Sequence, residues 1–371
     1  MKTAFLTIFT LYLSSNIYVA YSLWQIMPAS NIMRIAMITI LLIGLVSPFI
    51  FFAFGESMPI STAGTLYKLG TSWMIAFLYL FLFVFAIDIF RLSAHIFQFA
   101  SKDTITSIFR HNSLTTLILF GVTSILLVLG NINYHNKKRV HIPISSSKID
   151  NPLRIVAVSD LHLGYTISKK ELKKWVKIIN KEKPDMVLIA GDLIDNQLRP
   201  VLAQSLHKEL QKINAPMGLF ACTGNHEYIS GIKGSSDFFK MSGINLLRDS
   251  SITTNGITII GRDDYSHKNR KELSQITDNI DKKTFSILLD HQPNRLDDAV
   301  KEGIDLQLSG HTHYGQVFPA SLVTKKLFEL PHGYKQKENT HIYVSSGLGI
   351  WGGKFRIGTQ SEYVVIDLTS N

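Results

Sequence analysis

Five short clusters of metal-binding residue types lie in the second half of this 371-residue chain. They contain only Asp, Asn and His, and they are Asp160 with His162, Asp192 with Asp195, Asn225 with His226, His291, and His311 with His313. Any one cluster alone has a plainer explanation, such as a turn-capping aspartate or a buried structural histidine. Five in succession, most of them directly after predicted β-strands, favour a metal site.

Oxygen and imidazole donors without thiolates suit divalent ions such as Mn, Fe or Zn. These clusters contain enough donors for a pair of ions that share one bridging carboxylate, with further ligands for each ion. Cys222 is the only cysteine, so the sequence offers neither an intramolecular disulfide nor a cysteine-rich zinc site.

Short β-branched runs alternate with charged amphipathic segments after Arg139, which is the pattern of an α/β domain. A helix is predicted over residues 169–180, where Leu172, Trp175 and Ile179 fall on one face. Ligands in open α/β sheets bind at the carboxyl ends of strands, so clusters far apart in the sequence can converge there. The predicted strands are Arg154–Val158, Met186–Ala190, Gly218–Cys222, Ser286–Leu289, Asp305–Leu308, His341–Val344 and Tyr363–Asp367.

The first 135 residues are dominated by four apolar runs, at residues 4–24, 35–54, 73–90 and 114–132. Each is close to the roughly 20 residues that a bilayer requires, which predicts about four transmembrane helices in residues 1–135 and a catalytic domain in residues 136–371. The alternative for the first run is a cleaved signal peptide, but the run is long and has no clear small-residue cleavage site. Asp88, inside the third run, is expected to pair with Arg91.

The net charge of +10 bears on partners and orientation. In a membrane protein a basic balance reflects helix-flanking Lys and Arg more often than nucleic-acid binding, so nucleic acid is not an expected partner, and the sequence indicates no protein partner. Four spans place both termini on one side, and Lys137, Lys138 and Arg139 after the last span favour the cytoplasm for the catalytic domain. We therefore expect a multi-pass protein of a bacterial inner membrane, in contact with membrane lipids.

The five clusters lie in motifs that resemble those of the calcineurin-like metallophosphoesterases. They read SDLH at 159–162, GDLID at 191–195, GNHE at 224–227, DHQP at 290–293 and GHTHYGQ at 310–316. The resemblance covers residues 154–368 and is greatest to the branch with N-terminal membrane helices, which includes UDP-2,3-diacylglucosamine pyrophosphatase homologues. The chain departs from that branch at Tyr314, where a glycine is usual, and at Lys354 and Ser361, where prolines are usual.

The resemblance implies a four-layer αββα sandwich with two divalent metal ions, Mn being favoured over Fe or Zn. It implies that the first ion is held by Asp160, His162, Asp192 and His313, and the second by Asn225, His291 and His311, with Asp192 bridging. Asp195 is expected to orient a ligand or His226. Two cations about 4 Å apart activate water for in-line attack on phosphorus. His226 is then expected to donate a proton to the leaving oxygen, the alternative being a structural histidine.

The predicted function is a membrane-anchored, metal-dependent hydrolase of a phosphate ester or pyrophosphate, whose small-molecule substrate we expect to be lipid-linked because of the anchor. The alternatives are a catalytically inactive membrane-tethered sensor or scaffold, a phosphodiesterase acting on soluble nucleotides, and a small transporter with a regulatory domain. The complete ligand set argues against the inactive protein, and the scarcity of polar residues in the spans argues against the transporter. Residues 228–243, beside His226, are either an apolar and basic flap or an amphipathic helix packed on the sheet.

Overall fold

The structure, a computed structural model, describes residues 2–371, and these divide into two compact units after Gly130. The second unit begins inside helix α5 (Ser113–His135). The last turns of α5 belong to it because Asn131 and Asn133 donate hydrogen bonds to the backbone carbonyls of Lys354 and Arg356. The boundary predicted at residue 135 lies at the end of this same helix.

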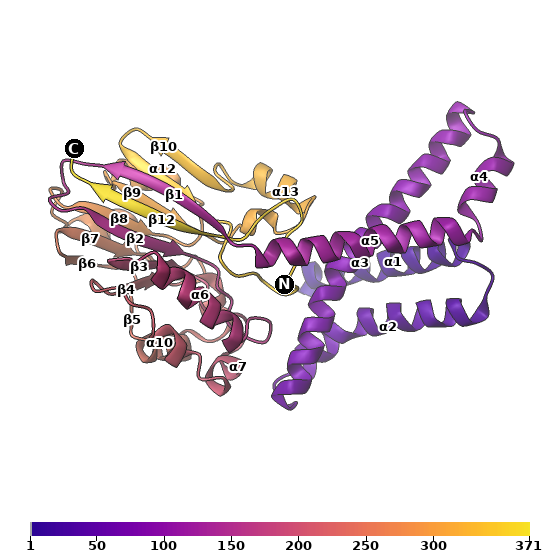
Figure 1. Cartoon of the computed structure of the whole chain (residues 1–371), viewed down its shortest axis with the longest axis horizontal. Coiled ribbons are helices and arrows are strands. Elements are labelled where there is room, and N and C mark those ends of the chain that lie inside the picture. The colour runs from indigo at the N-terminus through magenta and orange to yellow at the C-terminus, as the bar shows by residue number, and fades with distance from the viewer. Residues whose placement is uncertain (1) are drawn as a thin grey trace. The chain divides into compact units, whose positions relative to one another are not determined.

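The N-terminal unit consists of helices, several of which can cross a membrane (Figure 1). They are α1 (Lys2–Ile26), α2 (Asn31–Phe54), α3 (Ile60–Phe97), α4 (Lys102–Phe109) and most of α5. Within the described residues, α2, α3 and α5 are long and apolar enough to span a bilayer, and only 33%, 28% and 22% of their most apolar windows is buried in the protein. Apolar side chains exposed on this scale require lipid, so the unit associates with a membrane. The first predicted run forms α1, and the total of four spans stays a prediction.

Asp88, the carboxylate inside the third apolar run, has partners within the N-terminal unit. Its side chain lies 3.2 Å from the guanidinium of Arg91, and it accepts a hydrogen bond from the Tyr18 hydroxyl at 2.6 Å. The expected ion pair is therefore present, and Asp88 needs no functional explanation.

The second unit contains two six-stranded sheets. Its strands are β1 (Lys138–Ser145), β2 (Leu153–Val158), β3 (Met186–Ala190), β4 (Leu219–Cys222), β5 (Ile244–Leu246), β6 (Ser250–Thr254), β7 (Ile257–Gly261), β8 (Phe285–Leu289), β9 (Leu306–Ser309), β10 (Gly333–Lys337), β11 (Thr340–Val344) and β12 (Glu362–Thr369). The first sheet has the order β1-β12-β2-β3-β4-β5 and the second the order β10-β11-β9-β8-β7-β6.

The two sheets pack face to face, with helices on the outer faces. Alternate side chains of β2 enter different layers, because Ile155 and Ala157 join the core between the sheets while Val156 and Val158 pack against helices. The helices are α6 (Lys169–Lys181), α7 (Leu198–Ala203), α8 (His207–Leu210), α9 (Asn225–Ile229), α10 (Ile232–Met241), α11 (Leu273–Thr277), α12 (Leu296–Lys301) and α13 (Ala320–Leu327), with a 3₁₀ turn η1 (His313–Gly315). The expected αββα sandwich is thus confirmed.

All seven predicted strands are present, with ends within two residues of the prediction, and five others were not predicted. The most informative omission is β1, which pairs with β12 in parallel at the edge of the first sheet. Only Ile142 and Ile144 of β1 are buried, while its first half carries Lys138 and Arg139. An edge strand with so few inward apolar residues has little alternation to reveal it.

Residues 228–243 form a packed helix and not a flap. Helix α10 occupies most of this stretch, and its Phe238 and Phe239 are fully buried in the core against the first sheet. Of the two alternatives, the amphipathic helix is correct, because both aromatic rings are already committed to the interior.

Candidate metal centre

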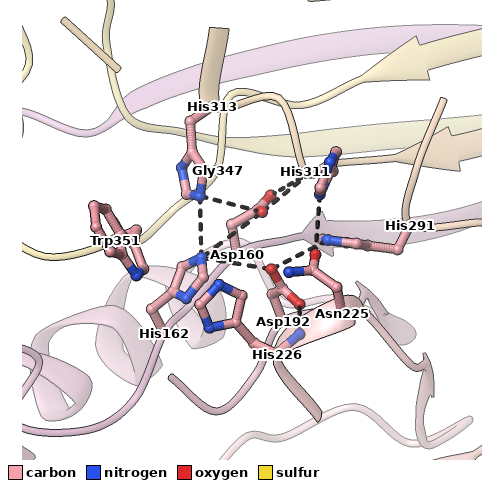
Figure 2. Close-up of polar contacts among 12 residues, drawn as sticks. Asp160, His162, Asp192, Asn225, His226, His291, His311, His313, Gly347 and Trp351 are labelled. Atoms are coloured by element: carbon pink, nitrogen blue, oxygen red, sulfur yellow. Dashed lines mark hydrogen bonds and ion pairs between the residues drawn. The ribbon is translucent and has the colours of Figure 1, made fainter. Parts of the chain in front are cut away.

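Eight of the nine residues singled out in the sequence converge on one site (Figure 2). They follow strands β2, β3 and β4 of the first sheet and β8 and β9 of the second, so both sheets contribute. These residues are Asp160, His162, Asp192, Asn225, His226, His291, His311 and His313. The ninth, Asp195, is connected to the site through His162 and His226, 3.5 Å from each. The structure therefore brings the whole predicted set together.

The first group of donor atoms comes from Asp160, His162 and His313. The Nε2 atoms of His162 and His313 lie 3.0 Å apart, and Asp160 Oδ1 lies 3.4 Å from the latter and 3.9 Å from the former. Two imidazole nitrogens can face each other this closely only if one carries a proton or both face a cation. With a buried carboxylate beside them, these atoms fit a divalent ion.

The second group is built around His291 and Asp192. His291 Nε2 lies 3.1 Å from Asp192 Oδ2, and the Asn225 side-chain oxygen lies 3.0 Å from His311 Nδ1. His291 Nδ1 is 2.8 Å from the carbonyl of Ala190 and donates to it, which leaves Nε2 facing the centre. These donors fit a second divalent ion in the same way.

Asp192 lies between the two groups. Its Oδ1 accepts a hydrogen bond from the backbone N–H of His226 at 2.9 Å. Its Oδ2 is 3.1 Å from Nε2 of His291 and 3.7 Å from Nε2 of His162. One oxygen is thus held by the protein, while the other faces a histidine of each group, as a bridging ligand must.

Buried carboxylates stabilise positive charge at this centre. Burial alone would raise the pKa of Asp192, but the neighbouring histidines, His291 foremost, hold that pKa well below its usual value. Although burial lowers the pKa of His291, the Asp192 carboxylate raises it well above the usual value. Burial and neighbouring cations lower the pKa of His313. The site therefore stabilises a cation near Asp192, either a proton or a metal ion, and offers a neutral imidazole beside it.

Left-handed backbone is frequent among the predicted ligands. Positive φ angles between 45° and 69° occur at five of the seven predicted ligands, namely Asp160, His162, Asp192, His311 and His313. Each such conformation costs a non-glycine residue about 1–3 kcal/mol and persists where surrounding contacts enforce it. The loops are held in conformations that aim the donor atoms at one another.

Two glycines of the motifs are required by close approach. A Cβ atom at Gly191, whose φ is +79°, would lie 2.6 Å from His291 Nδ1, and one at Gly224 would lie 2.1 Å from Asp192 Oδ1. Any side chain at either position would push a predicted ligand out of place.

Glu227 connects two of the loops, a role that the sequence did not reveal. Its buried carboxylate accepts hydrogen bonds from the backbone N–H groups of Asp192, Ile194 and Gly224, at 3.0, 3.1 and 2.7 Å. Burial and the Asp192 charge raise the pKa of Glu227 to about 7. Its motif GNHE was visible, but only the structure shows that it fixes the backbone of Asp192.

Arg356 is a second residue that the sequence gave no reason to choose. Its guanidinium is buried and donates to the carbonyls of His313 at 2.6 Å, Ser346 at 2.5 Å and Gly349 at 3.2 Å. Its Nε also donates to the Ser361 hydroxyl at 3.1 Å. Arg356 therefore ties the His313 loop to the chain around Gly347, which borders the site in Figure 2.

Tyr314, one of the three departures from the family pattern, occupies a left-handed conformation with φ of 50°. A glycine adopts this conformation without strain, which explains why one is usual there. The Tyr314 ring stacks on His332, with ring centroids 5.0 Å apart and an angle of 25° between planes. This contact helps to offset the strain that the side chain introduces.

Asp195 touches both a predicted ligand and the predicted proton donor. Its Oδ1 lies 3.5 Å from Nδ1 of His162 and 3.5 Å from Nδ1 of His226. The two imidazole rings meet edge to face, with centroids 4.5 Å apart. One carboxylate is therefore placed to orient both rings, and the sequence had left open which of the two it serves.

A further grouping of acidic and imidazole side chains lies apart from this centre, at Asp249, Asp263 and His267. Its carboxylates are already engaged, since Asp263 accepts from Arg248, Thr223 and Tyr228. The pattern is that of a structural network and not of a metal site.

Comparisons with known proteins agree with this geometry. The family model described as calcineurin-like phosphoesterase matches residues 153–315. An uncharacterized metallophosphoesterase of Campylobacter jejuni is 35% identical over 257 residues, which cover 67% of this chain and 68% of that protein. The chain belongs to the calcineurin-like phosphoesterase family.

Two further relatives carry metallophosphoesterase names, and one of them is named as a transmembrane protein. A transmembrane protein with metallophosphoesterase domain from Danio rerio is 31% identical over 68% of this chain and 62% of that protein. An uncharacterized metallophosphoesterase of Helicobacter pylori is 37% identical over 233 residues, and the match spans 62% of its length. None of these three names gives a substrate, so they do not show the narrower resemblance to UDP-2,3-diacylglucosamine pyrophosphatases.

Replacing Glu227 tests its role as the connection between loops. Glu227→Ala leaves three buried N–H groups without an acceptor, each worth about 1–3 kcal/mol, so we expect the free energy of unfolding to fall by several times the effect of a surface change. Denaturant unfolding of the purified protein measures this. Glu329→Ala, which removes two surface ion pairs each worth at most about 1 kcal/mol, is the control. Equal effects of the two substitutions would contradict the role.

Proposed function

We propose that this metallophosphoesterase is a membrane-anchored hydrolase that cleaves a phosphate ester or pyrophosphate with the help of two divalent metal ions. The observation that carries the proposal is the position of Asp192, whose Oδ2 faces His162 on one side and His291 on the other. A carboxylate so placed serves two cations at once, and a pair of cations is suited to phosphoryl transfer.

The residues divide between the two ions as the motifs imply. Asp160, His162 and His313 would hold one ion, Asn225, His291 and His311 the other, and Asp192 would serve both. When bound, the ions would supply charge to offset that of the phosphoryl oxygens and would make water more acidic. We favour Mn, since oxygen and imidazole donors suit it, with Fe and Zn as the alternatives.

His226 is the residue that we propose for proton transfer to the leaving oxygen. It is 9% exposed at the edge of the centre, and its backbone N–H holds Asp192 Oδ1 while Asp195 lies 3.5 Å from its Nδ1. In the protein without substrate, burial and the neighbouring His162 lower the pKa of His226. The negative charge of a bound phosphoryl group would oppose that effect, so that the proton is available when substrate is present.

A lipid-linked substrate is the finer part of the proposal. The supporting observation is the set of apolar helices that keeps the catalytic domain at a membrane. Confinement to a surface raises the effective concentration of the enzyme toward head groups borne by lipids, whereas an enzyme of soluble metabolites gains nothing from it.

We also propose that the catalytic domain faces the cytoplasm of a bacterial cell, from the inner membrane. The support is the basic cluster Lys137, Lys138 and Arg139 directly after α5.

A C-terminal reporter that fluoresces only in the cytoplasm should be bright. A dark reporter, together with activity of a reporter enzyme that works only outside the cytoplasm, would reverse the orientation.

The proton-transfer role predicts a separation of metal binding from turnover. His226→Ala should lower kcat by about 10²-fold or more while the metal content, measured by elemental analysis, stays unchanged. Removing the metals with a chelator should abolish activity in both the parent enzyme and the variant. Loss of metal in His226→Ala would instead make His226 a ligand.

The lipid-linked substrate predicts a dependence on the acyl chains. We expect kcat/KM of the full-length enzyme on a lipid-linked pyrophosphate in mixed micelles to exceed that on its chain-truncated analogue by about tenfold, which is ~1.4 kcal/mol. Equal values would refute tail recognition and direct the search to soluble nucleotides and phosphodiesters. Absence of hydrolysis of either, in metal-loaded protein, would favour a sensor or scaffold.

A further inference from the structure

A basic pocket of about 290 Å³ lies between the end of α5 and the start of α6, away from the predicted metal ligands. Four lysines line it, Lys137, Lys170, Lys174 and Lys354, and Glu171 is the only acidic residue among its lining side chains. A pocket with this excess of positive charge attracts an anion.

The single carboxylate of the pocket is already engaged. Glu171 accepts hydrogen bonds from the Tyr134 hydroxyl and from Lys354 Nζ. Within residues 2–371, Lys170 and Lys174 form no ion pair at all. Glu171 therefore neutralises one lysine and leaves three facing the pocket.

Lys137 is the least satisfied of these lysines. Its Nζ is buried and has no hydrogen-bond acceptor within the described part of the chain. Two aromatic faces lie close to it, with the ring centres of Tyr134 at 3.5 Å and Trp175 at 5.2 Å. Burial lowers the pKa of this ammonium well below its usual value, although Glu171 opposes the effect. This buried nitrogen therefore lacks the anionic acceptor that would stabilise its protonated form.

The start of α6 adds to the positive potential. Ser168, the N-cap of this 13-residue helix, lines the pocket, and its hydroxyl caps none of the N–H groups of the first turn. The N-terminal end of a helix carries a partial positive charge that favours phosphate oxygens. Lysines, helix terminus and hydroxyl together provide what a phosphate group requires.

The position of the pocket in the chain indicates the source of the phosphate. It begins at His135, the last residue of α5, which is one of the helices able to span a membrane. Trp175 and Ile178 give the pocket an apolar wall next to the lysines. We propose that this pocket binds the phosphate of an anionic membrane lipid, with the apolar wall beside the glycerol portion. The proposal depends on membrane association and not on the catalytic proposal.

The test is lipid binding by the full-length protein in detergent, measured by native mass spectrometry with phosphatidylglycerol and with phosphatidylcholine. Phosphatidylglycerol should bind more tightly, and Lys170→Gln with Lys174→Gln should weaken it by about tenfold or more. Lys177→Gln with Lys181→Gln is the matched control, since these exposed lysines lie on the same helix but outside the pocket. The control should keep the parent affinity.

Other outcomes would overturn the proposal. An equal loss in both double variants would mean diffuse attraction to a basic surface. Both lipids carry a phosphate and differ in net charge, so equal binding of the two would mean that the pocket does not select an anionic lipid. Inorganic phosphate that binds here as tightly as phosphatidylglycerol would identify a soluble anion as the ligand. Because Lys170 and Lys174 are exposed, both variants should unfold at the parent temperature, which the same samples can show.

Discussion

The structure depends above all on acidic side chains that are buried among histidines. Asp160 and Asp192 are 0% and 2% exposed, and each faces imidazole nitrogens at a distance of 3–4 Å. A buried carboxylate is costly unless positive charge lies beside it, so these residues require either protons on histidines or cations between them. Divalent ions meet that requirement for both groups at once.

The surrounding architecture keeps these donors from relaxing apart. The ligands have left-handed backbone, and neighbouring glycines leave no room for a side chain. Glu227 holds the Asp192 loop and Arg356 holds the His313 loop, so the ligand loops have little freedom to move. Two sheets contribute loops, so the centre exists only when the sandwich is closed. Stability of the fold and geometry of the centre are therefore coupled.

Sequence reasoning could reach the ligands because their types and their positions after strands are local features. It could reach the strands of continuous apolar character, such as β3, because these are buried on both faces. It could not predict β1, because the first half of this edge strand is charged and only Ile142 and Ile144 in its second half are buried. The roles of Glu227 and Arg356 could not be predicted for a different reason. Their roles arise from contacts 35 and 43 residues away along the chain, which no local pattern records.

The central claim is that Asp192 serves two metal ions, and the metal content of an Asp192→Asn variant tests it most directly. Asparagine can keep the bond from the His226 N–H through its oxygen, but its amide nitrogen then takes the place of Oδ2 and cannot bind a cation. After dialysis against Mn, elemental analysis should give two ions per chain for the parent protein and fewer for this variant, while Asp263→Asn keeps both. A parent protein that holds one ion or none, or an unchanged content in Asp192→Asn, would contradict the account.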